Sequence, residues 1–360
     1  MLIHHYVPFT SNVGDLFVRD GIHARLREQF PGAVIKELPA NDPHRRSQKP
    51  VGLIGANLEL TNAEAQLVIV GGSNMYEGPE WKLMTSVDAI NAINVPLAFI
   101  GLGVGSVRGD RVRPLTEKSK AEIRASHKKA IGVAVRDEAS VEFLEELGLQ
   151  GTMTACPATF VGRNPMRIRK PKHVVVSAPP ARFLPKWGHR GYFRSKVMIS
   201  TFTKVLQSLS EQSVTWEVIA HDDRDIEFLM PMLEIFGKKP LYFGNDPAPF
   251  YEEFKKADVA VCYRLHMGIS CLGWGVPFWL INFDLRTEAF RDTYGIGELS
   301  FDAFSLTDSR RLKRAVGSIK SFPSATERQK LEGMHGKREY YWSVTCAFYQ
   351  GLVSRLGTVP

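Results

Sequence analysis

Short apolar runs alternate with longer amphipathic stretches along most of the chain. The runs have the length of β-strands, and several are apolar throughout, which is typical of parallel strands covered on both faces by helices. In the first half they are Leu2–His5, Ala33–Glu37, Leu67–Val70, Leu97–Ile100, Ile131–Val135 and Gly151–Ala155. In the second half they are Val174–Ala178, Thr215–Ala220, Pro240–Phe243, Val259–Tyr263 and Phe278–Phe283. This pattern predicts an α/β protein with parallel sheets flanked by helices.

Two helices stand out in the same pattern. An apolar stripe with a step of four residues predicts a helix that begins just after Asn12–Asp15. The stripe consists of Val18, Ile22, Leu26 and Phe30. A second helix, rich in aromatic residues, is predicted from about Ser324 to Arg355. It either packs back across both halves of the chain or is the terminal helix of one domain.

A chain of 360 residues is long enough for two domains that each bury a core. Between the two series of strands, Gly162–Lys172 is basic, contains proline and shows no periodicity, which is typical of a linker. We therefore predict a Rossmann-like domain over residues 1–165, a second over 166–323 and a helical tail over 324–360.

Composition narrows the class of protein. With 44% hydrophobic and 23% charged residues the chain is globular, and the absence of a long apolar run predicts a cytoplasmic protein. The four cysteines are widely spaced, which indicates buried thiols rather than a zinc site or a disulfide framework. The net charge of +8 favours an anionic partner. Because the basic residues form only short, scattered clusters, we predict a small anionic substrate, or sugars on an anionic carrier, and no nucleic acid.

The most informative chemistry follows the apolar run Val259–Tyr263. Arg264 and His266 come at the predicted carboxyl end of this strand and at the start of a helix. Open α/β sheets bind ligands at that edge, and a guanidinium, an imidazole and helix N–H groups suit an anion that must also receive a proton. The alternative is that both residues only cap the helix.

Glycine-rich turns follow three strands of the first half, at Ser11–Asp15, Gly71–Asn74 and Gly101–Ser106. Glycine lets a ligand approach backbone N–H groups, although any tight turn from strand to helix also uses it. The third turn resembles a dinucleotide loop but lacks the final glycine and the later acidic residue, so we reject NAD.

Further basic residues stand at the ends of predicted strands. Arg136 follows Ile131–Val135 and either faces a ligand or pairs with Asp137 or Glu138. Asp284–Arg286 follows the last strand and either faces the same cleft or forms a solvated pair. Pro179–Lys196 mixes cationic and aromatic residues, as in a lid over a sugar or phosphate, or is an ordinary basic surface loop.

Taken in order, the motifs of residues 10–295 resemble the polysaccharide pyruvyl transferase family. They are NVGD at Asn12–Asp15, VGGSN at Val70–Asn74, GLGVGS at Gly101–Ser106, VRDEAS at Val135–Ser140, CPA at Cys156–Ala158, YRLHMGI at Tyr263–Ile269 and GVPFWLINFD at Gly275–Asp284. The resemblance implies two Rossmann-like domains that face each other across a cleft, as in GT-B glycosyltransferases. It also implies transfer of the enolpyruvyl group of phosphoenolpyruvate to a sugar, which forms a pyruvate ketal and releases phosphate.

Carried over to this chain, the resemblance places phosphoenolpyruvate between Arg136 of the first domain and the Arg264–His266 segment of the second. His266 is the candidate acid, since an adjacent anion would raise its pKa toward the protonated state. The expected substrate-binding residues are Asn12, Gly14, Asp15, Gly71, Gly72, Ser73, Gly103, Leu265 and Arg286. No metal or cofactor is assigned besides the donor, because the arginines would stabilise the departing phosphate.

This chain departs from the family pattern at two positions. They bear on the identity of the acceptor and on the loop geometry more than on the class of reaction. Ser73 replaces a third glycine, and Arg286 stands where a lysine is common. The acceptor sugar, lipid-linked or polymeric, stays unidentified, and peripheral membrane association and a homo-oligomer stay open. The competing hypotheses are a nucleotide-sugar-dependent GT-B glycosyltransferase and a non-catalytic protein that binds an anion or a glycan.

Overall fold

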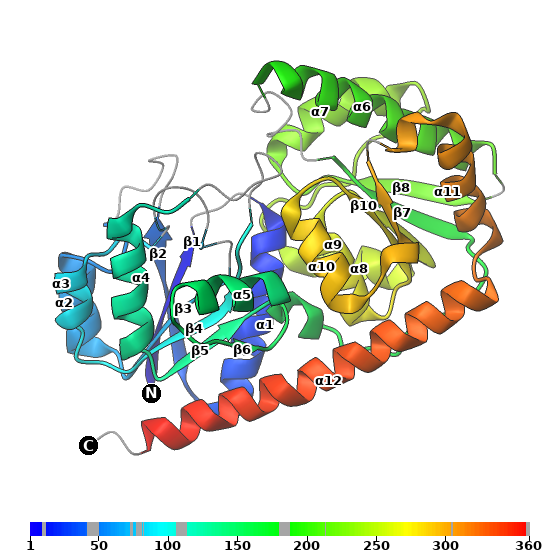
Figure 1. Cartoon of the computed structure of the whole chain (residues 1–360). Helices are drawn as coiled ribbons and strands as arrows, with labels where there is room; N and C mark the ends of the chain where they lie inside the picture. Colours follow the sequence, from blue (N-terminus) through cyan, green and yellow to red (C-terminus); the bar gives the residue numbers. More distant parts are fainter. Residues whose placement is uncertain are drawn as a thin grey trace.

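Two parallel β-sheets, each covered by helices, form the framework of the molecule (Figure 1). The computed structural model describes residues 1–8, 12–41, 50–72, 75–76, 81, 83–105, 114–179, 188–212, 214–303 and 305–357, with the backbone alone at 188–195, 197 and 320. No helix in these ranges is both long enough and apolar enough to cross a membrane.

The first sheet has six strands in the order β2-β1-β3-β4-β5-β6. They are β1 (Leu2–Pro8), β2 (Val34–Asn41), β3 (Leu67–Gly71), β4 (Leu97–Leu102), β5 (Gly132–Val135) and β6 (Thr152–Met153). The central strands β3 and β4 are buried at every position, because helices cover both faces of the sheet. The strand order switches between β1 and β3, and open α/β sheets bind ligands beyond the carboxyl ends of strands at such a point.

The second sheet has five strands in the order β11-β10-β9-β7-β8. They are β7 (His173–Ser177), β8 (Thr215–Ile219), β9 (Val259–Cys262), β10 (Phe278–Asn282) and β11 (Ser300–Asp302). Here β9 and β10 are buried throughout, and the strand order switches between β7 and β9. The two switch points mark the edges from which a shared site would be built.

Helices follow most strands, and many of them begin at a polar residue whose side chain caps the helix. Around the first sheet they are α1 (Val13–Gln29), α2 (Ala56–Glu64), α3 (Val87–Asn91), α4 (Glu117–Lys129), α5 (Glu138–Glu146) and the 3-10 helix η1 (Pro157–Phe160). Around the second they are α6 (Gly188–Ser210), α7 (Asp223–Glu234), α8 (Pro247–Lys256), α9 (Leu265–Trp274), α10 (Leu285–Tyr294), η3 (Gly297–Leu299), η4 (Ser305–Thr307) and α11 (Ser309–Ser321). Asn12 shows the capping device, since its side chain accepts a hydrogen bond from the N–H of Gly14 at 3.2 Å.

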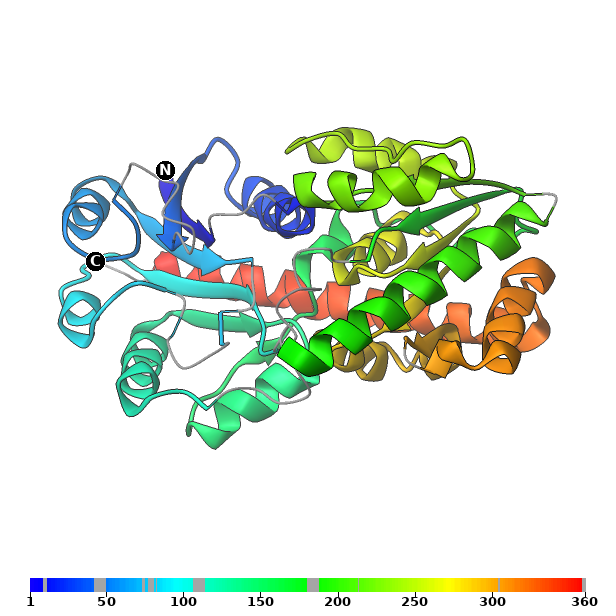
Figure 2. The same cartoon turned by 90° about the horizontal axis from the view of Figure 1, so that it is seen from above.

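Aromatic packing joins the two domains, whose sheets lie side by side in Figure 2. The ring of Phe17, on α1, lies 5.9, 5.2 and 5.8 Å from the rings of Phe250, Tyr251 and Phe254 on α8. The hydroxyl of Tyr251 donates to the carboxylate of Asp20 on α1 at 2.9 Å. Because α1 carries this contact, its amino end is held against the second domain.

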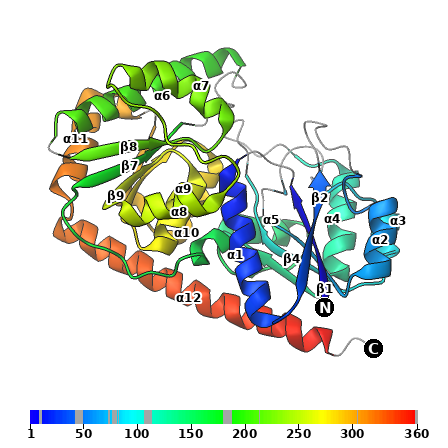
Figure 3. The same cartoon turned by 180° about the vertical axis from the view of Figure 1, so that it is seen from behind.

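The terminal helix α12 (Ala325–Leu356) runs along both domains, as Figures 1 and 3 show. Its Thr345 hydroxyl donates to the carbonyl of Thr154 in the first domain at 2.9 Å. Its fully buried Arg338 donates to the carbonyls of Asn164 at 2.7 Å and Leu272 at 2.9 Å. Of the two alternatives that the sequence left open, packing across both domains is therefore the one that the structure shows.

The structure confirms most predicted strands and corrects three expectations. Pro240–Phe243 is not a strand, because only Leu241 forms a bridge, with Ile219. The strand β11 was missed, since Ser300–Asp302 is only three residues long and two of the three are polar. Pro179–Lys196 is not a single loop, because α6 begins at Gly188, and residues 180–187 lie outside the described part. The domain boundaries at 165 and 323 stay predictions.

Candidate active site

His266 lies where the two domains meet, in the first turn of α9, and only 8% of its surface is exposed. Its Nδ1 is 4.0 Å from a carboxylate oxygen of Asp15, which belongs to α1 of the other domain. The fit is tight, since a Cβ atom on Gly14 would lie 2.7 Å from the same nitrogen. Its Nε2 is buried and makes no hydrogen bond with any described residue. The Nδ1 side of the imidazole is therefore held against α1.

Burial lowers the pKa of His266 to about 4, because the protonated ring would lose its solvation. The charge of Asp15 raises this pKa, the guanidinium groups of Arg136 and Arg286 lower it, and Asp284 raises it. In the free protein desolvation outweighs Asp15, so the imidazole is neutral at pH 7. Asp15 shifts the pKa in the direction expected of an adjacent anion, and the effect of a bound donor stays a prediction.

Arg136, at the carboxyl end of β5, is buried and fixed by a chain of polar contacts. Its Nε donates to Asp137 at 3.1 Å, and Asp137 accepts hydrogen bonds from the N–H at 2.9 Å and the hydroxyl of Ser140. The hydroxyl oxygen of Ser140 in turn accepts from the N–H of Val104 at 2.9 Å. The ion pair with Asp137 that the sequence left open is thus present, and it ties Arg136 to the glycine-rich loop after β4.

Two glycines of that loop each lie directly against an arginine side chain. A Cβ atom on Gly103 would lie 2.1 Å from Nε of Arg136, and one on Gly105 would lie 2.5 Å from Cγ of Arg286. Arg286 comes from α10 of the second domain, and its Nε donates to Asp284 at 3.0 Å. The loop therefore brings guanidinium groups from both domains to one place, close enough to His266 for both charges to affect its pKa.

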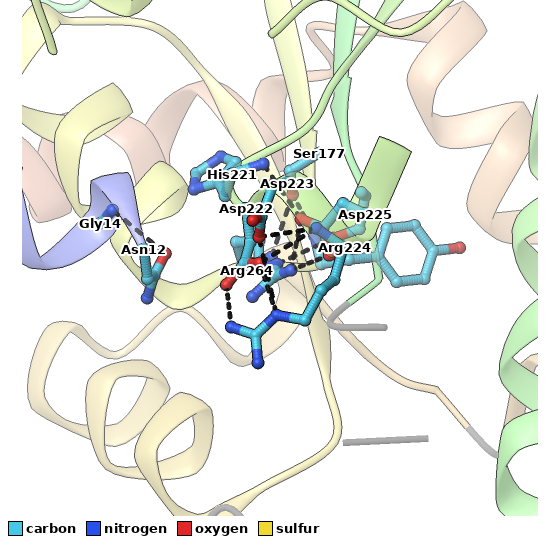
Figure 4. A network of polar contacts seen from close by, with 11 residues as sticks. Asn12, Gly14, Ser177, His221, Asp222, Asp223, Arg224, Asp225 and Arg264 are labelled. Atoms are coloured by element: carbon cyan, nitrogen blue, oxygen red, sulfur yellow. Dashed lines mark hydrogen bonds and ion pairs between the residues drawn. The ribbon is translucent and has the colours of Figure 1, made fainter. Parts of the chain in front are cut away.

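Arg264, which precedes His266, forms a buried ion pair inside the second domain (Figure 4). Its Nη2 bonds both carboxylate oxygens of Asp225, and its Nε donates to the carbonyl of Ala178 at 3.2 Å. Its backbone N–H donates to the hydroxyl of Ser177 at 3.0 Å. The guanidinium therefore reaches the site already neutralised by Asp225, which is fully buried. It does not cap α9 through its side chain.

The segment that supports Arg264 was not among the predicted site residues. His221 follows β8, and its N–H donates to Asp225 at 3.0 Å while its carbonyl accepts from the N–H of Val13 in the first domain at 3.1 Å. Both ring nitrogens of His221 are buried without a hydrogen bond to any described residue. The sequence does contain a signal for this segment. His221–Asp225 reads HDDRD and directly follows a predicted strand, and a position directly after a predicted strand is what identified Arg136 and Arg264 as candidates.

The remaining predicted residues fall into two groups. Asn12 caps α1, Gly14 and Asp15 lie against His266, and Leu265 is buried beside it in the first turn of α9. Gly71 ends β3, and a Cβ atom there would lie 2.4 Å from the carbonyl oxygen of Ile100. Gly72 follows with a φ of +89°. Backbone packing therefore explains the first glycine, and backbone conformation explains the second. Ser73 lies outside the described residues.

Comparison with known proteins identifies the family. A family model for polysaccharide pyruvyl transferase matches residues 12–284. The chain belongs to the polysaccharide pyruvyl transferase family. It is therefore a transferase of polysaccharide biosynthesis, and the match covers every candidate site residue except Arg286. No curated protein gives a significant match.

Solved structures show the fold of this family member. The putative UDP-N-acetylglucosamine 2-epimerase of Listeria monocytogenes is 11% identical with a TM-score of 0.56, over 93% of this chain and 90% of that one. S. aureus MnaA with UDP is 12% identical with a TM-score of 0.51, over 95% and 97%. The UDP-GlcNAc 2-epimerase of Methanocaldococcus jannaschii is 10% identical with a TM-score of 0.52, over 94% and 98%. At such identities the likeness shows the GT-B fold alone.

Across the part of the chain that the structure describes, no group of three or more His, Cys, Asp or Glu side chains is placed to hold a metal ion. Of the cysteines, Cys156, Cys262 and Cys271 are buried free thiols and Cys346 is half-buried.

The close contact between Gly103 and Arg136 predicts that a methyl group added at position 103 weakens the binding of phosphoenolpyruvate. Gly103→Ala would place Cβ 2.1 Å from Nε of Arg136, so the guanidinium would have to leave its position beside Asp137. We expect the affinity for phosphoenolpyruvate to fall at least about tenfold, as for a lost charged hydrogen bond. Isothermal titration with phosphoenolpyruvate measures this. In the control Gly333→Ala, where a Cβ meets nothing within 4 Å, affinity should be unchanged. Equal affinities in the two variants would contradict the prediction.

Proposed function

We propose that this enzyme transfers the enolpyruvyl group of phosphoenolpyruvate to a sugar of a polysaccharide or its precursor, forming a pyruvate ketal and releasing phosphate. The observation that carries the proposal is the buried Nε2 of His266, which has no partner among the described residues and lies near Arg136 and Arg286 of opposite domains. A donor that carries both a phosphate and a carboxylate suits two separate guanidinium groups. Because phosphoenolpyruvate is a cytoplasmic metabolite, the proposed reaction belongs to the cytoplasm.

The proposed reaction requires a proton to be added to a carbon atom of phosphoenolpyruvate. His266 would deliver it from Nε2 to the methylene carbon of the donor, which creates positive character at C2. A sugar hydroxyl then adds to C2, the bond from C2 to the phosphate oxygen breaks, and a second hydroxyl closes the ketal. The two hydroxyls lose two protons: one balances the proton gained by the new methyl group, and the other leaves with phosphate.

Because His266 is neutral in the free protein, the proposed mechanism requires that the donor binds before His266 is protonated. An imidazole with a pKa of about 4 carries no proton to give at pH 7. Three negative charges on the bound donor would raise that pKa, since Arg136 and Arg286 would then be shared with the donor instead of acting on the ring alone. Donor binding would therefore charge the acid, and the arginines would stabilise the phosphate as it leaves.

A thermal-shift titration with phosphoenolpyruvate tests the donor without knowledge of the acceptor. A ligand that binds only the folded protein raises its melting temperature in a saturable manner. We expect such a rise in the wild type and its loss in Arg136→Met. Arg19→Met is the control, because Arg19 pairs with Glu37 on the surface of the first domain. Stabilisation by nucleotide sugars and not by phosphoenolpyruvate would overturn the proposal in favour of a glycosyltransferase.

A further inference from the structure

The helix α11 carries a concentration of positive charge that the proposed reaction does not use. Five basic residues and one acidic residue give residues 305–323 a net charge of +4, against +8 for the whole chain. Half of the excess charge of the protein is therefore placed on one helix and its cap. Figures 1 and 2 both show α11 at the end of the second domain that points away from the first sheet.

The two faces of α11 differ sharply. Leu312, Ala315, Val316 and Ile319 are buried against the second domain. The side chains of Arg310, Arg311, Lys313 and Arg314 are all exposed. The acidic residue, Asp308, is the N-cap and accepts a hydrogen bond from the N–H of Arg310 at 2.7 Å, so its carboxylate is directed to the start of the helix. Lys204 on α6, the helix against which α11 packs, is exposed as well.

Charge neutralisation distinguishes α11 from α4, another helix rich in basic residues. On α4, Lys118 lies 3.9 Å from Glu122, and Lys120 lies 2.7 Å from Glu117. None of the four exposed basic side chains of α11 forms an ion pair with a residue that the structure describes. Since a surface ion pair contributes little to stability, leaving these charges unpaired costs the fold little. The patch is thus free to meet an external array of negative charge.

We propose that the exposed face of α11 is a docking surface for an anionic membrane leaflet. Each basic side chain near such a surface improves partitioning by about fivefold, so four together give an attachment of several hundredfold. Because the apolar face of α11 is already used in the core, no insertion into the lipid follows. The attachment would be electrostatic, reversible and weakened by salt. This inference does not depend on the identity of the donor.

The residue types on the exposed face of α11 favour a lipid surface over nucleic acid. Sequence-specific binding to nucleic acid needs side chains that reach base edges from an element that enters a groove, or aromatic rings on which bases stack. The helix α11 packs against α6, and its exposed residues among those described are only Arg, Lys, Gly and Ser. An array of anionic headgroups is the partner that such a group of basic side chains without aromatic rings fits.

Sedimentation with vesicles tests the proposal on the full-length protein. Vesicles of phosphatidylcholine alone are compared with vesicles that also contain phosphatidylglycerol, at low and at physiological salt. The wild type should bind only the anionic vesicles and should dissociate as salt rises. The variant R310Q/R311Q/K313Q/R314Q should lose about 100-fold or more in partitioning. The control K118Q/K120Q/K128Q/K129Q removes the same charge from α4 and should stay within about threefold of the wild type.

Each outcome decides the question. Equal losses in the two variants would show that net charge alone is responsible and would overturn the proposal, as would equal binding to neutral vesicles or no binding at low salt. Tighter binding to single- or double-stranded DNA than to vesicles would overturn it in favour of nucleic acid. Circular dichroism checks the fold of the α11 variant. If that variant does not fold, R310Q/R314Q and R311Q/K313Q should each lose roughly tenfold or more.

Discussion

Glutamine in place of His266 is expected to lower the rate of pyruvyl transfer by about 10²- to 10⁴-fold, the range for loss of a general acid. Glutamine preserves bulk and a hydrogen-bonding group at the junction but does not titrate near neutral pH. Binding of phosphoenolpyruvate should change far less, because the guanidinium groups of Arg136 and Arg286 remain. Phosphate release with sugar acceptors measures turnover, and calorimetry measures donor affinity.

A matched variant in the same domain separates chemistry from folding. His173 stands at the amino end of β7, the edge of the second sheet opposite to the candidate site, and its Nδ1 contacts the Thr215 hydroxyl at 2.9 Å. His173→Gln should leave turnover within about twofold of the wild type. If His266→Gln weakens donor binding as much as it slows turnover, His266 is a ligand of the donor and not the acid.

The pH dependence of the same residue gives a second readout. With a pKa of about 4, His266 should be neutral in the free enzyme from pH 7 down to about pH 5. Bound phosphoenolpyruvate should raise that pKa, so at pH 6 the donor should convert neutral imidazole to imidazolium. NMR of ring-labelled histidine, assigned with His266→Gln, would detect the change. An imidazole that stays neutral with donor bound would contradict its role as the acid.

Asparagine in place of Asp225 is expected to destabilise the protein by about 3–5 kcal/mol, the usual cost of removing one partner of a buried ion pair. Asp225 is fully buried and is the carboxylate that neutralises Arg264. Asparagine keeps an oxygen for the N–H of His221 but leaves the guanidinium without a counter-charge. Urea denaturation, with the midpoint and slope fitted together, measures the loss of free energy.

The neighbouring aspartate supplies the control. Asp223 is largely exposed and lies 3.8 Å from Arg224, so Asp223→Asn should change stability by no more than about 0.5 kcal/mol. The double variant R264M/D225N should recover part of the loss, because no charge is then left buried. A similar stability in Asp223→Asn and Asp225→Asn would show that the Arg264 pair is not the reason for any loss.

The sequence predicted the framework well because the framework depends on local pattern. Strands such as β3, β4, β9 and β10 are continuous apolar runs, and parallel sheets covered on both faces require such runs. The polar strand β11 was missed because its three residues show no pattern apart from their pairing with β10.

The site was predicted in part for a similar reason. Arg136, Arg264 and His266 each follow a strand, and the carboxyl ends of parallel strands face one edge of a sheet. Their partners could not be predicted in that way. Asp225 and Arg264 are 39 residues apart in the chain, and Asp15 and His266 belong to different domains. The sequence showed which groups could carry charge but not which charges cancel.

The sequence by itself therefore determined the two α/β halves, the long terminal helix and the position of the basic residues at the ends of strands. Only the tertiary structure decided that Arg264 is neutralised by Asp225, that Gly103 and Gly105 make room for arginines of opposite domains, and that His266 is neutral. The physical reason is that hydrophobic periodicity acts over neighbouring residues, whereas desolvation and ion pairing depend on groups that only folding brings together.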